Sequence, residues 1–180
     1  MEFNVLLEED AIRPDDLKIR KRLNQQDPYG DAKFAGEEVL MDQRSKGGFP
    51  WVAFRYADVI GPRDVTRRFA FYHTWLKFYE DIGIPFYLPK KLEKVSESIT
   101  YVEDAADMVI KVIEKGPDYW NHAYNIATLA VLTLKEIIEK MSDKMNVQIQ
   151  DTDPNDHNLF MYPTVHSGGK TLIKLNIVIS

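Results

Sequence analysis

Strand-like runs alternate with helical patterns along most of this chain, and that alternation restricts the folds it can adopt. Residues 50–56 (PWVAFRY) and 122–126 (HAYNI) have the aromatic and β-branched character of strands. Helical patterns run over about 65–81, 104–114 and 133–142. Strands that alternate with helices pack into parallel sheets covered by those helices. The sequence therefore predicts an α/β class with at least part of a parallel sheet.

An additional helix is predicted to begin beside Asp27, which suits an N-cap, and Pro28, which suits the first helical position. We expect this helix to run to about Lys46. Tyr29 and Lys33 are four residues apart on it, so both lie on one face, one turn apart. An ammonium group held near a phenol favours the phenolate and lowers the tyrosine pKa from its ordinary value of about 10. The spacing thus predicts a general acid or base that works near neutral pH.

The composition of the chain argues against several classes of function. The chain has 28 acidic and 23 basic residues, a net charge of −5, which argues against nucleic-acid binding by bulk charge. No apolar run reaches the roughly 20 residues that span a bilayer, and the first residues do not resemble a signal peptide. Cysteine is absent and the four histidines lack metal-ligand spacing. We expect a cytoplasmic protein with no bound metal, no nucleic-acid partner and no membrane contact.

Further local patterns predict loops and helix starts elsewhere in the chain. Residues 1–26 are polar and are interpreted as a surface loop. Asp104 is predicted to cap the helix over 104–114, so a catalytic role for it is the weaker interpretation. Thr133 and Glu136 have the spacing of a capping box. From Gln148 onward the alternation of strands and helices is no longer visible, although 172–179 is strand-like.

Four motifs in order resemble the extended short-chain dehydrogenases/reductases, the NAD-dependent epimerase/dehydratase family. Residues 27–38 (DPYGDAKFAGEE) are similar to its YxxxKxxxE helix, and 54–64 (FRYADVIGPRD) to its RxxNxxGP stretch. Residues 99–106 (ITYVEDAA) resemble its VdD element, and 123–126 (AYNI) followed by Thr133 resemble its yNi and vTl elements. Each motif is weak alone, and their order carries the resemblance.

The resemblance implies a Rossmann-type doubly wound sheet and roles for particular residues. Tyr29 would be the catalytic acid/base, and Lys33 would hold the nicotinamide ribose. Tyr56 and Ala57 would lie beside the nicotinamide. The substrate side would include Asp58, where many members have asparagine, and also Arg63 in the loop after Gly61 and Pro62. The cofactor would be NAD or NADP, with an unidentified small-molecule substrate.

The departures from the family pattern are equally specific. The family holds its dinucleotide on a glycine-rich turn at a helix N-terminus, but this chain has no glycine before Gly30. Residues 1–28 contain no serine or threonine to act beside the tyrosine. Glu97 stands where nucleotide-sugar enzymes usually carry an arginine.

We therefore interpret residues 1–144 as the C-terminal part of such a domain and 145–180 as an irregular, truncated tail. We expect the isolated chain to bind no NAD and to lack dehydrogenase activity. One hypothesis is a portion of an NAD(P)-dependent epimerase/dehydratase or oxidoreductase. The other is a non-catalytic binding or interaction module derived from the same fold. A homodimer of the full-length protein is left open.

Overall fold

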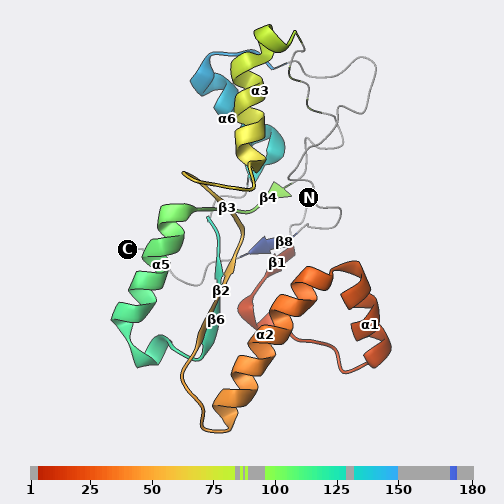
Figure 1. The fold of residues 1–180 in the computed structure, drawn as a ribbon, viewed down its shortest axis with the longest axis vertical. Helices are drawn as coiled ribbons and strands as arrows, with labels where there is room; N and C mark the ends of the chain where they lie inside the picture. Colours follow the sequence, from red (N-terminus) through yellow and green to blue (C-terminus); the bar gives the residue numbers. More distant parts are fainter. Residues whose placement is uncertain are drawn as a thin grey trace.

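A computed structural model describes residues 4–83, 86, 88, 96–128, 132–149 and 171–173. Its first part comprises β1 (Asn4–Leu6), the 3-10 turn η1 (Glu8–Asp10), α1 (Leu17–Gln26) and α2 (Pro28–Ser45). The middle comprises β2 (Val52–Tyr56), β3 (Asp58–Ile60), α3 (Arg68–Ile82), β4 (Ser96–Glu97), β5 (Ile99–Tyr101) and α5 (Val102–Lys115). The last part comprises η2 (Pro117–Tyr119), β6 (His122–Ile126), β7 (Leu132–Thr133), α6 (Leu134–Met145) and β8 (Thr171–Ile173). Figure 1 labels the helices and most of the strands and colours them in chain order from red to blue.

Within the described segments the strands form two-stranded ladders. Parallel ladders join β1 to β8, β2 to β6 and β3 to β5, whereas β4 and β7 are antiparallel. The β2–β6 ladder aligns Val52 with His122 and Tyr56 with Ile126. The predicted α/β class with parallel pairing is confirmed, and the strand expected over 122–126 has the expected bounds.

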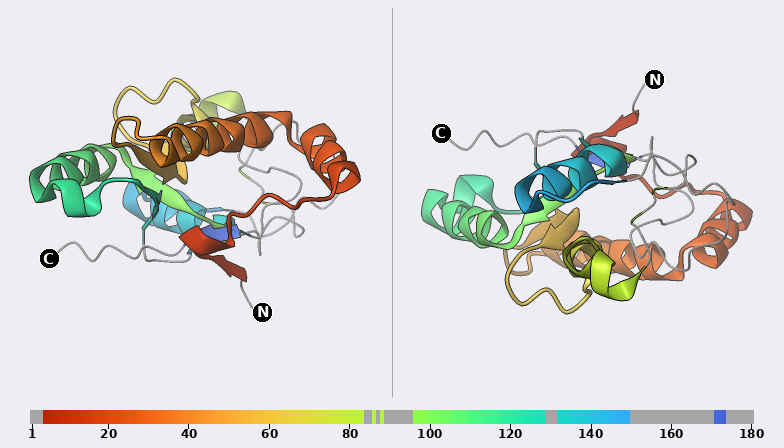
Figure 2. Two further views of the ribbon diagram at one scale, coloured as in Figure 1. Left: turned by 90° about the horizontal axis from the view of Figure 1, so that it is seen from below. Right: turned by 90° about the horizontal axis from the view of Figure 1, so that it is seen from above.

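The clustered core lies between α3 and α6, which pack side by side (Figures 1 and 2). Tyr72 and Leu76 of α3 are fully buried, as are Leu134 and Ile138 of α6. Phe86 packs edge-on against the rings of Tyr72 and Trp75, an arrangement that aromatic pairs favour. The aromatic helix expected over 65–81 is confirmed as α3, although it begins at Arg68. Its buried side faces α6. Phe78 is exposed and breaks the helical backbone geometry.

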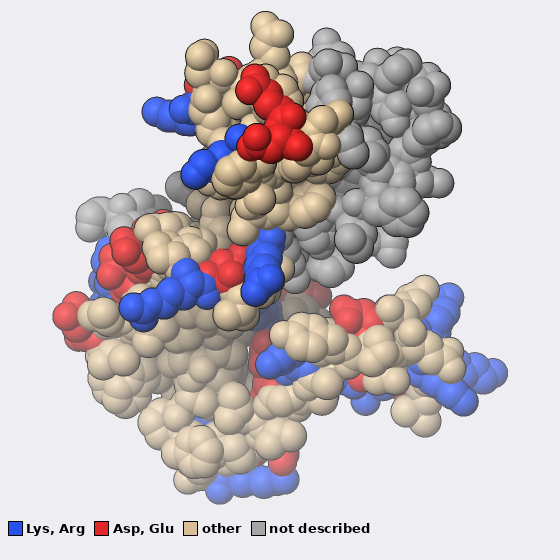
Figure 3. Space-filling view, turned by 45° about the horizontal axis from the view of Figure 1, so that its top comes forward, with Lys and Arg blue, Asp and Glu red and all other residues tan. Residues whose placement is uncertain are grey.

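The polar start of the chain was expected to be a loop, and this expectation is wrong for α1. Asp16 caps α1, because its carboxylate accepts the backbone N–H groups of Lys18 and Ile19 at 2.7 and 3.4 Å. The helix carries Lys18, Arg20, Lys21 and Arg22. Basic side chains gather over this part of the surface at the right of Figure 3. The sequence did contain a signal for this helix: Asp16 suits an N-cap, and the ten residues after it contain no proline.

The interpretation of Asp104 as an N-cap is also wrong. The helix α5 begins at Val102, with Tyr101 at the N-cap position, and Asp104 lies in its first turn. An acidic residue there is favoured by the helix dipole without capping the backbone. Ala105, Met108 and Val112 of α5 are buried. None of the described helices is long and apolar enough to cross a membrane.

The capping box predicted at α6 is confirmed. The N–H of Glu136 donates to the Thr133 hydroxyl at 3.2 Å, and the Glu136 carboxylate accepts from the Thr133 N–H at 2.7 Å. The helix continues to Met145, beyond the expected end near Ser142. The proposed tail over 145–180 lies mostly outside the described residues, but Thr171–Ile173 is a strand.

Replacing Thr133 with alanine is expected to lower the free energy of unfolding by about 1 kcal/mol, because its hydroxyl no longer accepts the Glu136 N–H or donates to the Glu136 carboxylate. The Thr133 backbone and hydroxyl donors lower the pKa of Glu136, so this carboxylate stabilises the fold above its unfolded pKa and loses that effect as the pH falls. Urea unfolding of the unsubstituted chain and of Thr133→Ala, at pH 7 and at acidic pH, measures the loss of free energy of unfolding and its dependence on pH. We expect a smaller loss in acid, where the Glu136 carboxylate is protonated. An equal loss at the two pH values would contradict the role of the charged Glu136 carboxylate in the cap.

Candidate active site

The start of α2 presents Tyr29 and Lys33 to solvent. The Asp27 carboxylate accepts the Gly30 N–H at 2.9 Å, and Pro28 occupies the first helical position. Both capping features predicted from the sequence are confirmed, as is the helix end just before Gly47. The cap fixes where α2 begins, and so it fixes which face of the first two turns carries the tyrosine and the lysine.

Lys33 and Tyr29 are brought together as their spacing predicts. The Lys33 Nζ lies 5.4 Å from the centre of the Tyr29 ring, within the range of a cation–π contact. The Tyr29 side chain is 74% exposed, and Lys33 is exposed too. A hydroxyl and an ammonium are thus both accessible to a small molecule at one helix end. Their acid/base and ribose-holding roles stay predictions.

A bidentate ion pair attaches α2 to the strand β2. The Arg55 guanidinium donates through Nε and Nη2 to the Glu37 carboxylate, with distances of 3.0, 3.1 and 2.6 Å. These side chains are only 19% and 12% exposed. Charge-assisted, two-pronged hydrogen bonds of this kind fix orientation as well as distance. Glu37 is one turn beyond Lys33, so the pair holds the helix that carries the candidate acid/base.

Arg13 adds a second attachment to the same helix. It forms ion pairs with Asp31 at 3.1 Å and Glu38 at 3.2 Å, and it donates to the Asp31 carbonyl at 3.1 Å. The guanidinium groups of Arg13 and Arg55 lie 5.5 and 5.9 Å from the centre of the Phe34 ring. The Phe34 ring therefore packs near two cations, a favourable arrangement for an aromatic face.

The segment before α1 completes this attachment. The Glu8 carbonyl accepts from Arg55 Nη1 at 3.3 Å, and its carboxylate accepts the Asn125 N–H of β6 at 2.9 Å. Sequence reasoning assigned no role to Glu8, Arg13, Glu37 or Arg55. Glu37 and Arg55 were nevertheless visible as the last residue of YxxxKxxxE and the first of RxxNxxGP.

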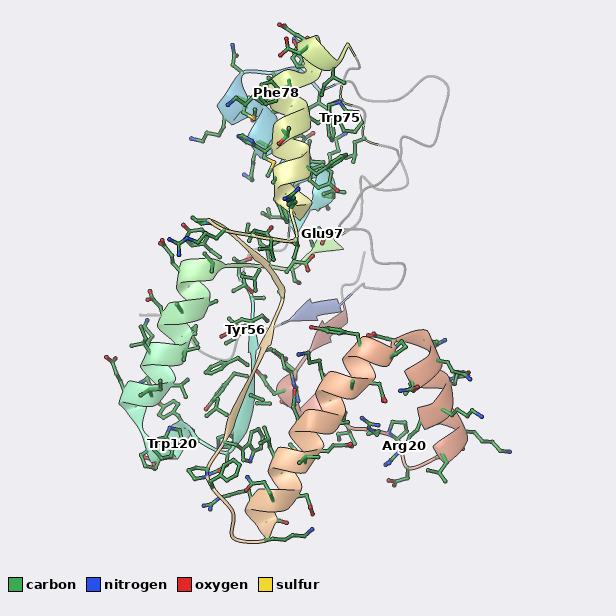
Figure 4. The ribbon with its side chains drawn as sticks, viewed as in Figure 1. Arg20, Tyr56, Trp75, Phe78, Glu97 and Trp120 are labelled. Atoms are coloured by element: carbon green, nitrogen blue, oxygen red, sulfur yellow. The ribbon has the colours of Figure 1, made fainter. Side chains whose placement is uncertain are left out.

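The predicted cofactor contact Tyr56 points to the other side of the β2–β6 ladder. Its hydroxyl lies 3.5 Å from the Ala105 carbonyl of α5, and its ring stacks beside Phe54. Figure 4 labels Tyr56 at β2. Burial raises the pKa of Tyr56 above its ordinary value. Successive residues of a strand point to opposite faces, and Arg55 faces α2. The side chains of Tyr56 and Tyr29 are thus not brought together.

The other predicted residues lie where β2 ends and β3 begins. The Ala57 N–H donates to the Ile126 carbonyl at 3.0 Å, and the Asp58 N–H donates to the Ser98 carbonyl at 3.2 Å. Gly61 has a φ of +138°, and a Cβ there would come within 2.6 Å of Val102. Arg63 is exposed in the turn that follows. The two hydrogen bonds hold the link between β2 and β3 against Ile126 of β6 and against Ser98. Gly61 lies close to Val102 at the start of α5.

Comparison with known proteins gives one family match. Residues 8–127 match the model of the NAD-dependent epimerase/dehydratase family, two thirds of the chain. No match was found to a curated protein. No group of three or more His, Asp or Glu side chains that could hold a metal occurs within the described segments.

Solved structures resemble the chain over most of its length. A UDP-glucose 4-epimerase from Thermus thermophilus in complex with NAD matches at 21% identity and a TM-score of 0.58, covering 85% of this chain and 47% of that one. A UDP-glucuronic acid 4-epimerase from Bacillus cereus in complex with NAD matches at 19% identity and a TM-score of 0.61, covering 84% of this chain and 45% of that one. The protein RMD from Pseudomonas aeruginosa, complexed with NADPH, matches at 18% identity and a TM-score of 0.60, covering 82% of this chain and 45% of that one.

These identities are low, so the likeness shows the fold alone, which is part of a Rossmann-type α/β fold. The chain spans less than half the length of the solved structures named above.

Proposed function

Because this chain belongs to the NAD-dependent epimerase/dehydratase family, we propose that it supplies the acid/base side of an NAD(P)-dependent epimerase/dehydratase or oxidoreductase site. The observation that supports the proposal best is the exposed Tyr29 ring with the Lys33 ammonium 5.4 Å from its centre. In this proposal the Tyr29 hydroxyl passes a proton to or from a substrate hydroxyl or carbonyl. Lys33 holds the nicotinamide ribose, and Asp58 and Arg63 lie on the substrate side.

The described residues fit one end of such a cofactor. Relatives with this fold are described in complex with NAD or NADPH, and a nicotinamide supplies hydride transfer when it is bound. Tyr29 and Lys33 are exposed together and can meet a ribose hydroxyl. The diphosphate requires a glycine-rich turn at a helix N-terminus, and no glycine precedes Gly30. We therefore propose that residues outside this chain hold the diphosphate.

A second candidate is a non-catalytic module of the same fold. It is favoured by the lack of serine and threonine in residues 1–28. The buried Glu97 in β4 also favours it, since nucleotide-sugar enzymes of the family usually carry an arginine at that position. A protein built this way would keep the fold of α2 and lose turnover. Cofactor binding and turnover together separate the two candidates.

The test is titration calorimetry with NAD⁺, NADP⁺ and their reduced forms. The 180-residue chain is expected to give no measurable heat of binding. A protein that extends it upstream through a strand, a glycine-rich turn and a helix is expected to bind one of these cofactors and to reduce or oxidise it on a substrate.

Two results would overturn parts of this proposal. A micromolar isotherm with the 180-residue chain would contradict a diphosphate site outside it. Failure of the extended, folded protein to bind any nicotinamide cofactor would contradict the enzyme, whereas binding without turnover on any substrate favours the non-catalytic module.

A further inference from the structure

A cavity of about 400 Å³ lies where α3 and α6 meet the ends of β3, β5 and β7. Its apolar lining includes Ile60, Phe69, Ile99, Leu132, Ile137 and Met141. This volume is within the usual range of small-molecule sites, which are mostly apolar with a few polar groups. The cavity lies at the α3–α6 end of the molecule, away from α2 (Figure 1). It therefore goes beyond the acid/base site proposed above.

The ionisable side chains among the described lining residues are all basic: Lys140 and Lys144 of α6, and His73 of α3. Lys140 and Lys144 are one turn apart on one helix face, so both ammonium groups can reach the same rim. Long lysine stems lie along apolar surface while the charged ends remain in water. His73 is exposed at the same cavity and can donate a hydrogen bond.

We propose that this cavity binds a small amphipathic anion, a carboxylate with an extended apolar body such as a medium-chain fatty acid. The apolar body lies among the side chains of β3, β5 and α6, where its burial provides most of the affinity. The carboxylate lies at the rim, between Lys140 and Lys144. Met141 is unbranched and flexible, which suits a ligand whose shape varies. Charge complementarity excludes an amine of the same size.

The experiment titrates decanoate and decanol into the 180-residue chain by calorimetry at neutral pH. Decanoate is expected to saturate at one molecule per chain, and decanol, which lacks the charge, to bind about tenfold more weakly. The double substitution Lys140→Gln and Lys144→Gln is expected to weaken decanoate about tenfold while leaving decanol within about twofold. Lys77→Gln, an exposed lysine of α3 outside the described lining, is the matched control and is expected to change neither affinity.

Met141→Trp fills the cavity and is expected to abolish binding of both compounds, with thermal unfolding by circular dichroism confirming that each variant is folded. The proposal is overturned if decanoate does not saturate, if decanol binds as tightly as decanoate, or if the double substitution weakens both compounds equally. Sedimentation velocity is run in parallel. A dimer that dissociates in Met141→Trp, without decanoate binding to the unsubstituted chain, would instead assign the cavity to a contact between copies and would also overturn the proposal.

Discussion

Replacing Tyr29 with phenylalanine, in a protein that joins this chain to a nicotinamide-binding half, is expected to lower turnover about a hundredfold or more. The substitution removes only the hydroxyl that passes the proton, and positioned acid/base groups contribute rate factors of this order. The phenyl ring remains beneath the Lys33 ammonium, which lies 5.4 Å from the centre of the Tyr29 ring. Cofactor affinity should therefore change by less than about threefold, because no ribose contact of Lys33 is removed.

The measurement follows reduction or oxidation of the bound nicotinamide in single turnovers, over a panel of nucleotide sugars and simple alcohols and ketones. Tyr119→Phe is the matched control, because Tyr119 is a half-buried tyrosine of η2, outside α2 and outside the loop that carries Arg63. It is expected to leave turnover unchanged. Turnover that survives in Tyr29→Phe would remove the acid/base role, and a parallel loss of cofactor affinity would show that the hydroxyl acts in binding.

Glu37→Ala is expected to lower the free energy of unfolding by about 2–3 kcal/mol. Removing one partner of a largely buried ion pair leaves the other charge without compensation, which typically costs about 3–5 kcal/mol. The expected value is smaller here because Arg55 and Glu37 retain 19% and 12% exposure, and because Arg55 Nη1 still donates to the Glu8 carbonyl. Denaturant unfolding of the 180-residue chain measures the change.

A double-mutant cycle distinguishes the ion pair from simple loss of packing. The cycle compares Arg55→Met, Glu37→Leu and the variant that carries both substitutions. The double variant is expected to lose less free energy of unfolding than the two single variants together, by about 1–2 kcal/mol, because it leaves no uncompensated charge. Asp42→Ala is the control, since its ion pair with Lys46 on the same helix is exposed and is expected to contribute less than about 0.5 kcal/mol. Strict additivity of the two changes would show that the pair does not hold α2 to β2.

Features encoded by neighbouring residues could be predicted from the sequence. Asp27 and Pro28 indicated where α2 begins, and the capping box of Thr133 and Glu136 did the same for α6. The contact between Tyr29 and Lys33 followed from helical spacing alone. The errors at α1 and α5 are of the same local kind: the capping residue of α1 was not recognised, and Asp104 was mistaken for a cap instead of a first-turn acid.

The sequence by itself determined the family, the parallel α/β class and the pairing of Tyr29 with Lys33, because each depends on motif order or on residues within one helical turn. Tertiary structure alone decided that Arg55 meets Glu37 and that Arg13 meets Asp31. It also decided that Tyr56 turns toward α5, away from α2. Alternation along a strand says that Arg55 and Tyr56 face opposite sides, but not which helix covers each side. The cavity between α3 and α6 has the same origin: it forms where segments distant in the chain pack together, and no local pattern specifies that approach.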